Sequence, residues 1–347
     1  METKRIKIRN TYIGGGARVT VQSMTNTDTR DAVKTTEQIL KLEDAGCEII
    51  RFSVYDEACA AAIPYIREHT HIPLVADIHF DHRLAIAAIE NGIDKVRINP
   101  GNIGSEQKVR ELVAAAKAHG IPIRIGVNGG SLEKDILAKY GVTAQGMVQS
   151  ALGHVAILER CGFEDIVISM KASTVLKTVE ANRLIREMAP YPLHLGVTEA
   201  GMGDAALVKG AVGIGSLLLD GIGDTIRVSL TGDPVNEVYA AKHILSAVGL
   251  RNDGVEVVSC PTCGRTRVDL ASIVKKVKDS LPKTDKSLRI AVMGCAVNGP
   301  GEAREADMGI AFGSANAVVF KKGELCYSDK LPFVIDRFIE DVKKELE

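Results

Sequence analysis

The residue types best suited to chemistry in this 347-residue chain lie in the segment 259–305. Cys260 and Cys263 belong to a Cys-Pro-Thr-Cys-Gly run, and Cys295 and Glu302 belong to a later run, Met-Gly-Cys-Ala-Val-Asn-Gly-Pro-Gly-Glu. Three thiolates and one carboxylate at these intervals predict a metal site, and the ligand set decides which metal it would hold.

Zinc is one interpretation, because a Cys-x-x-Cys pair beside Pro and Gly also begins a zinc ribbon. Structural zinc normally takes four Cys or His ligands. All eight histidines, however, lie at or before His243, and Cys295 and Cys326 are not a close pair. The missing second half of the ribbon makes zinc the weaker interpretation.

Iron–sulfur clusters usually take four cysteine thiolates, so three cysteines leave one iron for another ligand. Glu302, beyond the Asn-Gly-Pro-Gly turn at 298–301, could supply a hard oxygen ligand that a substrate displaces. An exchangeable iron indicates catalysis rather than simple electron relay. Spacing alone leaves open the alternative that Glu302 is a solvated acid near Glu305 and Asp307.

The composition argues against several classes of protein. The 43 Lys and Arg residues nearly balance the 44 Asp and Glu residues, so the net charge of −1 gives no general nucleic-acid or membrane signature. No apolar run approaches the roughly 18 to 20 residues of a membrane span, and residues 1–6 begin neither a signal peptide nor a transit peptide. We therefore expect a cytoplasmic protein, in which seven cysteines indicate thiol or metal chemistry rather than a disulfide framework.

Strand and helix patterns alternate over the first two thirds of the chain. Eight such units in about 230 residues predict a (β/α)8 TIM barrel, an α/β fold whose site lies at the C-terminal ends of the strands. A doubly wound open sheet is the competing fold. The β-branched runs that begin the units lie near Val19, Glu48, Pro73, Lys95, Pro122, Asp165, Pro192 and Asp224.

We expect two domains, the barrel over residues 1–249 and a small α+β domain over residues 250–347. A hairpin that contains Ile6–Ile8 and a glycine turn at 14–16 should precede the first barrel strand. Residues 129–147 form an insertion on the active-site face that could act as a lid. In the small domain, the patterns predict a connector at 249–257, helices at 268–280 and 332–346, and strands at 289–293, 308–312 and 317–320.

Cationic residues recur near the ends of the expected strands, which converge at the mouth of a barrel. Charges buried there imply either several salt bridges or an anion held between them. Guanidinium groups bind phosphate in bidentate fashion, and few acids share the rim, so the expected ligand is a polyanion, most simply a diphosphate. The cations of the rim are Arg51, Arg97, Arg124, Lys171 and Arg227.

Other polar residues share the expected mouth. His79 and Asn128 add neutral polar groups, and Glu199 is the acid best placed to serve as a proton donor or base. Alternatively, Glu199 or Asp77 pairs with an arginine of the rim. The glycines at 210–215 and 221–223 suggest a dinucleotide site, but the first run lacks the third glycine of G-x-G-x-x-G, so a nicotinamide site is a weak interpretation. We expect these glycines to shape the loop before the last barrel strand.

These motifs closely resemble the 4-hydroxy-3-methylbut-2-en-1-yl diphosphate synthase family in its bacterial two-domain form. The resemblance rests on the cysteine and Asn-Gly-Pro-Gly-Glu runs and on the strand ends QSMT, RFSV, ADIHF, VRINPGN, GVNGG, GVTEAGMG and DTIRVSLT, and it covers nearly the whole chain. It implies an iron–sulfur oxidoreductase that reductively opens 2-C-methyl-D-erythritol 2,4-cyclodiphosphate and removes a hydroxyl as water. The product would be 4-hydroxy-3-methylbut-2-enyl diphosphate of the non-mevalonate isoprenoid pathway.

The resemblance also implies roles for individual residues. Cys260, Cys263, Cys295 and Glu302 would bind a 4Fe-4S cluster, and Glu199 would be the acid/base group. Flavodoxin or ferredoxin would supply the electrons one at a time. The residues implied to contact the substrate are Arg51, His79, Arg97, Arg124, Asn128, Lys171, Ser229 and Asn298.

An alternative function is a non-redox barrel of the pterin-dependent transferase type with a zinc-stabilised appendage, and metal content separates the two. The chain direction further predicts a head-to-tail homodimer. The last barrel helix, 234–248, should end on the face opposite the site, and the connector 249–257 spans at most ~30 Å. We therefore expect each cluster domain to cap the barrel of its neighbour, and the resemblance points the same way.

Overall fold

The computed structural model describes residues 2–99, 103, 105–251, 254–282, 284, 286–295 and 305–347. The chain divides into two compact units, Met1–Val248 and Gly249–Glu347. Each unit has its own core of buried apolar side chains. No helix in the described ranges combines the length and the apolar character that crossing a membrane requires.

Eight parallel strands close into a barrel, which confirms the predicted fold. The hydrogen-bonded order is β8-β7-β6-β5-β4-β3-β10-β9, and a bridge between Ile168 and Leu193 joins β8 to the chain just before β9. This closure excludes the competing open sheet. The strands are β3 (Thr20–Met24), β4 (Ile49–Ser53), β5 (Leu74–Asp77), β6 (Lys95–Ile98), β7 (Ile123–Asn128), β8 (Ile166–Lys171), β9 (His194–Leu195) and β10 (Thr225–Ile226).

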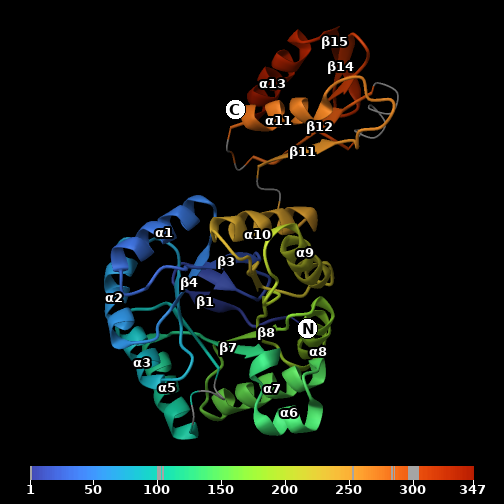
Figure 1. Cartoon of the computed structure of the whole chain (residues 1–347). Helices are drawn as coiled ribbons and strands as arrows, with labels where there is room; N and C mark the ends of the chain where they lie inside the picture. Colours follow the sequence, from blue (N-terminus) through green and yellow to red (C-terminus); the bar gives the residue numbers. More distant parts are fainter. Residues whose placement is uncertain are drawn as a thin grey trace. The chain divides into compact units, whose positions relative to one another are not determined.

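Helices form a ring around these strands (Figure 1). Their apolar faces pack against outward-facing strand residues such as Phe52 and Ile125. The expected boundary signals operate at both ends: the Asp31 side chain accepts from the backbone N–H of Lys34 at 3.1 Å, and Gly120 ends a helix with a φ of 65°. The helices are α1 (Ala32–Asp44), α2 (Glu57–Glu68), α3 (His82–Glu90), α5 (Glu106–His119), α7 (Ala144–Arg160), α8 (Val175–Met188), α9 (Gly203–Leu219) and α10 (Val235–Ala247).

The glycines at 210–215 lie inside α9, so the expectation that they shape a loop was wrong for them, whereas Gly221 and Gly223 lie in the loop before β10 with positive φ. A Cβ atom on Gly213 would lie 2.5 Å from the Val197 side chain, just after β9. This glycine therefore allows the helix to approach the barrel wall closely, which is a packing role that a glycine-rich pattern in sequence does not distinguish from a turn.

A short antiparallel hairpin precedes the barrel, but its turn differs from the predicted one. β1 (Ile6–Ile8) pairs with β2 (Thr11–Ile13), so the chain turns at Arg9 and Asn10 rather than at the glycines 14–16. Arg9 adopts a φ of 46°, which is uncommon outside glycine.

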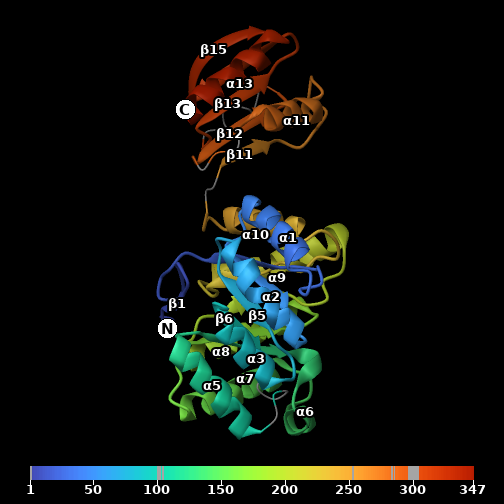
Figure 2. The same ribbon diagram turned by 90° about the vertical axis from the view of Figure 1, so that its left-hand side faces the viewer.

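The hairpin closes the end of the barrel at which the strands begin. Ile8 and Ile13 form one buried cluster with Ile49 and Val75. The Arg9 guanidinium donates to two backbone carbonyls in the segment before β5, at 3.1 and 3.2 Å. In Figure 2, β1 lies at the left-hand end of the barrel and the short helix α6 (Lys134–Tyr140) at the right-hand end.

The segment 129–147 contains a 3₁₀ turn (Gly129–Ser131), α6 and the start of α7. No side chain of α6 is buried. Glu133, just before α6, forms an ion pair with the buried Nε2 of His154 on α7, and Ser150 Oγ lies 3.5 Å from the same nitrogen. This pair anchors the segment at its base, and a role as a lid stays a prediction.

The second unit is one five-stranded sheet with helices α11 (Leu270–Ser280) and α13 (Phe333–Leu346) packed in its core. Its first three strands are parallel and its last two are antiparallel. Two strands were not predicted: β11 occupies part of the expected connector, which shortens the connector to 249–254, and β15 follows β14 directly. The strands are β11 (Val255–Ser259), β12 (Leu288–Met293), β13 (Met308–Phe312), β14 (Asn316–Lys321) and β15 (Glu324–Lys330).

Candidate functional site

The mouth of the barrel is lined by inward-facing side chains near the ends of the strands. Side chains alternate between the two faces of a strand, so Arg97 points into the barrel while Val96 and Ile98 pack against the helices. The strand register places Asp77 beside Arg97, and Arg97 beside Arg124. Charged groups therefore meet on neighbouring strands.

Asp77 is the carboxylate around which these cations gather. Its Oδ1 accepts from Nη1 of Arg97 at 2.9 Å, while Nε of Arg51 and Nε2 of His79 lie 3.7 and 3.6 Å from Oδ2. Burial favours a raised pKa for Asp77, but Arg51, the hydrogen bond from His79 and Arg97 hold that pKa well below its ordinary value. One ionised carboxylate thus serves two arginines.

Within the described residues, the second acceptor of Arg51 is a soft one. Its Nη2 and Nε lie 2.8 and 3.1 Å from the Met24 sulfur, which supplies no negative charge. Burial lowers the pKa of Arg51 to about 10, an effect that Asp77 opposes and that Arg227 and Arg97 reinforce. The guanidinium is therefore poorly compensated in the free protein.

Arg124 is a buried cation without a carboxylate partner in the described part of the chain. It is 1% exposed, and neither its Nε nor its Nη1 has a hydrogen-bond partner there. Burial, followed by repulsion from Arg51 and Arg97, lowers its pKa well below the ordinary value. The alternative that Arg124 pairs with Asp77 or Glu199 is therefore not observed, whereas the corresponding pairing of Arg97 is.

Lys171 lies at the end of β8 with its ammonium inside the barrel. Its Nζ donates to Nε2 of His194 at 3.2 Å, and Nδ1 of His194 lies 3.4 Å from Oγ1 of Thr225. Burial, followed by repulsion from Arg124, lowers the pKa of Lys171 well below its ordinary value. A Cβ atom on Gly196 would lie 2.7 Å from this Nζ and from the backbone oxygen of Arg227, so glycine leaves room for both.

Arg227 is neutralised, unlike Arg124. Its Nη2 and Nε donate to the two carboxylate oxygens of Glu237 at 3.0 and 3.2 Å. Glu237 belongs to α10, is 2% exposed and also accepts from Ser23 Oγ at 3.0 Å. The sequence did not identify this acid, because it lies on a helix and not on the rim.

The remaining predicted residues of the barrel lie in or after the strand ends. Asn128 ends β7 and is in register with Lys171, and Ser229 follows β10 in a half-buried position. Glu199 is exposed in the loop after β9 and adopts a φ of 52°. Among the described residues no cation pairs with the Glu199 carboxylate, and Lys209 Nζ lies 3.5 Å from its backbone oxygen. A left-handed non-glycine residue is one that often marks a functional loop.

Two buried residues below the mouth were missed in the sequence, Lys95 and His194. Lys95 is 0% exposed, and its Nζ has no hydrogen-bond partner within the described ranges. The signal was available, because Lys95 precedes Arg97 by two residues and must share its face of the strand. His194, the first residue of β9, likewise lies two residues before Gly196, which leaves room for Lys171.

The second unit brings two of its cysteines to one edge of the sheet. Ser259 of β11 is in register with Val292 of β12, so Cys260 and Cys295 both follow the carboxyl ends of neighbouring parallel strands. The backbone N–H of Gly294 donates to Sγ of Cys260 at 3.2 Å. This hydrogen bond joins the two strand ends at the sulfur itself.

Cys263 lies on a turn attached to the same edge. Its backbone N–H and C=O bond Thr266 at 3.1 and 2.9 Å, and the N–H of Arg267 donates to the carbonyl of Gly294 at 3.3 Å. The backbone N–H of Arg265, followed by its side chain, lowers the pKa of the Cys263 thiol. The environment therefore favours the thiolate, the form that binds metals.

The chemistry of these donors fits an iron–sulfur cluster. Thiolates are the ligands such clusters use, and a backbone N–H directed at a ligand sulfur is a hydrogen bond that tunes their potential. Within the described residues no three Cys, His, Asp or Glu side chains already form a metal-binding group. Glu302 and Asn298, the remaining predicted residues, lie outside the described residues.

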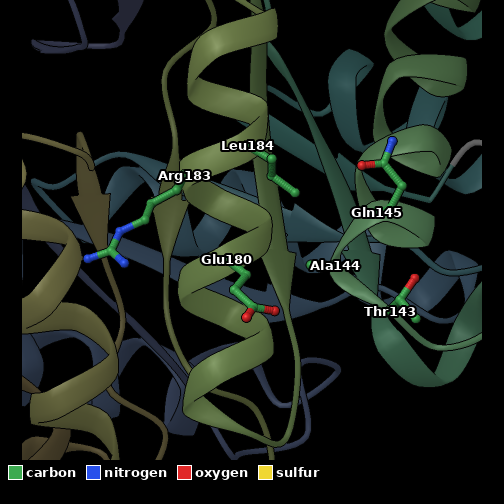
Figure 3. Close-up of a pocket in the computed structure, with 6 residues that line it drawn as sticks. All are labelled: Thr143, Ala144, Gln145, Glu180, Arg183 and Leu184. Atoms are coloured by element: carbon green, nitrogen blue, oxygen red, sulfur yellow. The ribbon is translucent and has the colours of Figure 1, made fainter.

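A surface hollow on the barrel lies between α7 and α8, away from these charges (Figure 3). Its lining is mostly apolar, and Arg183 at its border turns away to pair with Asp220 at 2.7 Å. It offers no group for the chemistry predicted here. The lining residues are Thr143, Ala144, Gln145, Glu180, Arg183 and Leu184.

Both units match known family models. Residues 3–242 match the GcpE TIM-barrel domain, and residues 256–344 match the GcpE protein C-terminal domain. Together the two models span most of the chain.

Curated proteins called 4-hydroxy-3-methylbut-2-en-1-yl diphosphate synthase (flavodoxin) are similar over nearly the full length. The protein from Caldanaerobacter subterraneus subsp. tengcongensis is 56% identical over 343 residues, which cover 99% of this chain and 97% of that protein. Those from Clostridium acetobutylicum and Geobacter sulfurreducens are 55% and 53% identical, each over 99% of this chain and 98% of the relative.

Solved structures show likeness in the barrel alone. 3-Dehydroquinate dehydratase from Geobacillus kaustophilus has a TM-score of 0.51 at 15% identity, covering 72% of this chain and 98% of that chain. Dihydropteroate synthase from Yersinia pestis has a TM-score of 0.50 at 13% identity, covering 70% and 98%. Identities this low support a shared fold and nothing about chemistry.

Proposed function

The chain belongs to the GcpE family of 4-hydroxy-3-methylbut-2-en-1-yl diphosphate synthases, and from that premise we propose how its residues divide the reaction. The enzyme reductively opens the ring of 2-C-methyl-D-erythritol 2,4-cyclodiphosphate with electrons from flavodoxin. Two electrons enter, a ring carbon–oxygen bond breaks to free one end of the diphosphate, and one hydroxyl leaves as water after taking up a proton. Family membership confirms this predicted function over the pterin-transferase alternative.

The barrel mouth binds the diphosphate. The observation that carries this assignment is the presence of Arg124 and Lys171, two buried cations with no carboxylate partner in the described part of the chain. Two buried positive charges are costly until an anion compensates them. A cyclic diphosphate supplies two negative charges, and its oxygens accept charge-assisted hydrogen bonds from both groups.

The other residues of the mouth orient the substrate around that anchor. Arg51 and Arg97, which share Asp77, add two further guanidinium groups. His79 is half-exposed, and its Nε2 lies 3.6 Å from the same carboxylate, so the ring is free to donate to a ligand. The uncharged residues assigned to substrate contact are Asn128, Ser229 and Asn298, the last of them outside the described residues.

Glu199 is the residue to which we assign proton transfer. It follows the carboxyl end of β9, is exposed, and has no competing cation among the described residues. A carboxyl group there can protonate the departing hydroxyl, which then leaves as water. The left-handed backbone conformation of Glu199 fixes the direction in which its side chain leaves the loop.

Cys260, Cys263, Cys295 and Glu302 are assigned to a 4Fe-4S cluster. When bound, such a cluster supplies the two electrons one at a time and an iron able to accept a substrate oxygen. The chain contributes three thiolates, a backbone N–H of Gly294 that donates to the Cys260 sulfur, and a carboxylate ligand that the substrate could displace.

Anaerobically purified protein tests the assignment. We expect iron and inorganic sulfide in about equal amounts, and turnover of the cyclodiphosphate with reduced flavodoxin. Cys263→Ser should lose the cluster. Cys326 lies on β15, and Cys326→Ser is the matched control that should keep the cluster. Stoichiometric zinc without sulfide would overturn the cluster assignment.

We further propose that two chains form a head-to-tail homodimer in which each cluster unit serves the neighbouring barrel. α10 returns the chain to the end of the barrel at which the strands begin. A helix of 13 residues is ~20 Å long, so this end lies ~20 Å from the mouth. The connector 249–254 spans at most ~22 Å. Reaching its own mouth would require a fully extended climb along the barrel wall. The exposed apolar side chains Val208, Val212 and Leu219 on α9 offer a surface that a second copy could cover.

Mixed dimers test this proposal. Glu199→Ala and Cys263→Ser are each expected to be inactive, but a dimer with one chain of each kind has one site that combines an intact barrel with an intact cluster. Activity should therefore return in isolated mixed dimers to about half that of wild-type dimers, on the symmetry argument that one of two sites is whole. Mixed dimers as inactive as either parent would show that each site is built from one chain.

A further inference from the structure

Lys95 is the first residue of β6 and lies wholly inside the barrel. It is 0% exposed, and its Nζ has no hydrogen-bond partner in the described residues. Lys95 shares the inward face of β6 with Arg97, two residues nearer the mouth. The ammonium group therefore lies below the cations assigned to the diphosphate.

Among the described residues, the charged groups that act on Lys95 are cations. Burial, followed by repulsion from Arg124 and Arg51, lowers the pKa of Lys95 well below its ordinary value. The charge of Lys95 in turn helps to lower the pKa of buried His194. Asp77, the carboxylate of this region, is already bonded to Arg97 and lies near Arg51.

Other buried polar atoms inside the barrel also lack partners in the described residues. They include Oγ1 of Thr20, both side-chain polar atoms of Gln22, Nε of Arg97 and two guanidinium nitrogens of Arg124. Buried polar groups are normally bonded, and each exception calls for an explanation, of which an absent ligand is one. Donors predominate among these inward-facing atoms, so the missing ligand group is an acceptor.

We propose that Lys95 is a further positioning residue of the anion site, which stabilises the deeper phosphoryl group of the bound diphosphate from inside the barrel together with Arg124. This inference rests on the proposed binding of diphosphate at the mouth. In the free protein the buried ammonium of Lys95 is uncompensated and lowers stability. In the complex the phosphoryl charge compensates it. Lys95 thus stabilises the complex at the expense of the free fold.

The test uses inorganic diphosphate as the probe and the full chain. Lys95→Met removes the ammonium and keeps the length of the side chain. Lys117→Met is the matched control, because Lys117 lies in the last turn of α5 and donates to the carbonyl of Cys161 at 2.6 Å, outside the barrel interior. The dissociation constant is measured by titration calorimetry at low and high salt, and the melting temperature is measured without ligand.

We expect Lys95→Met to weaken diphosphate binding by about 10- to 100-fold, the range for one lost charge-assisted contact. The loss should persist at high salt, because a buried charge is poorly screened. The melting temperature without diphosphate should rise or stay unchanged. Lys117→Met should leave the dissociation constant unchanged.

Three results would overturn the inference. One is unchanged diphosphate affinity in Lys95→Met while Arg124→Ala weakens it, which would leave the mouth assignment intact and remove Lys95 alone. Another is a large fall in melting temperature in both Lys95→Met and Lys95→Gln, which would make the lysine a structural group. If Arg124→Ala also bound diphosphate as the wild type does, the anion site itself would be wrong.

Discussion

Replacing Asp77 by Asn is expected to destabilise the barrel strongly and to tighten its binding of anions. The substitution keeps the shape of the side chain and one oxygen acceptor for Arg97, so its effect measures the negative charge. That charge compensates Arg97 at 2.9 Å and Arg51 at 3.7 Å, and Arg124 lies close enough to lower the pKa of Asp77. Without it, three buried guanidinium groups repel one another.

The magnitude follows from the burial of the pair. Asp77 and Arg97 are 4% and 6% exposed, and removing one partner of a buried ion pair costs about 3–5 kcal/mol. For a unit of this size, that loss corresponds to a fall of about 6–20 °C in melting temperature. Asp220→Asn is the matched control, because the Arg183–Asp220 pair is exposed and its loss should change little.

Urea unfolding followed by tyrosine circular dichroism suits the measurement. The chain has no Trp, and Tyr327 is the one tyrosine of its seven that belongs to the second unit, so the signal reports the barrel. The pKa of Asp77 is lowered in the folded state. Its contribution is therefore present above the unfolded pKa of about 4 and is lost as pH falls through the lower folded value. The difference between wild type and variant should be constant from about pH 5 to pH 8.

Two outcomes would refute this reasoning. Asp77→Asn could unfold at the same urea concentration as Asp220→Asn, which would mean that the arginines do not need the carboxylate. Alternatively, the stability difference could titrate near neutral pH, which would assign it to another group. We also expect inorganic diphosphate to raise the melting temperature of Asp77→Asn more than that of the wild type, because the anion replaces the lost charge.

Other perturbations separate the anion site from the cluster. Arg124→Ala and Lys171→Ala should each raise the Michaelis constant for the cyclodiphosphate by about 10-fold or more while the iron content stays unchanged, and unchanged constants would count against the anion site. Gly196→Ala should weaken diphosphate binding and also lower the melting temperature, because its Cβ atom would lie 2.7 Å from both Lys171 Nζ and the Arg227 carbonyl oxygen; normal diphosphate binding in this variant would show that the lysine has room to move. Glu302→Ala should retain much of the iron that Cys263→Ser loses, and equal loss by iron analysis and electron paramagnetic resonance would refute the expected order of ligand strength.

The barrel could be predicted from the sequence because each unit carries its own local signals. Alternating β-branched runs and capped helices fix the strand and helix periods, and eight units in sequence leave few other folds. The two short strands β9 and β10 were found because buried apolar runs precede their helices. β11 was missed because all of its residues lie in exposed or half-exposed positions, where no alternation of buried apolar residues marks a strand.

The candidate site was less predictable, since partners on other elements decide the state of each charge. Rim position identified Arg97, Arg124 and Arg227 equally, yet Glu237 on a helix neutralises Arg227 and nothing comparable compensates Arg124 in the described residues. No fixed spacing in the sequence reveals tertiary contacts of this kind. Lys95 shows the opposite case, because strand alternation alone would have placed it inside the barrel.

The hairpin of β1 and β2 determines how ligands enter and leave the barrel. Because Ile8 and Ile13 seal the end of the barrel at which the strands begin, a ligand reaches the buried cations from the opposite end and must leave the same way. Substrate and product both carry a diphosphate, so they use the same opening and compete for the same cations. Product should therefore inhibit competitively against substrate. If another part of the enzyme covers that opening during reduction, it must move away once in every catalytic cycle. Turnover should then slow as solvent viscosity rises.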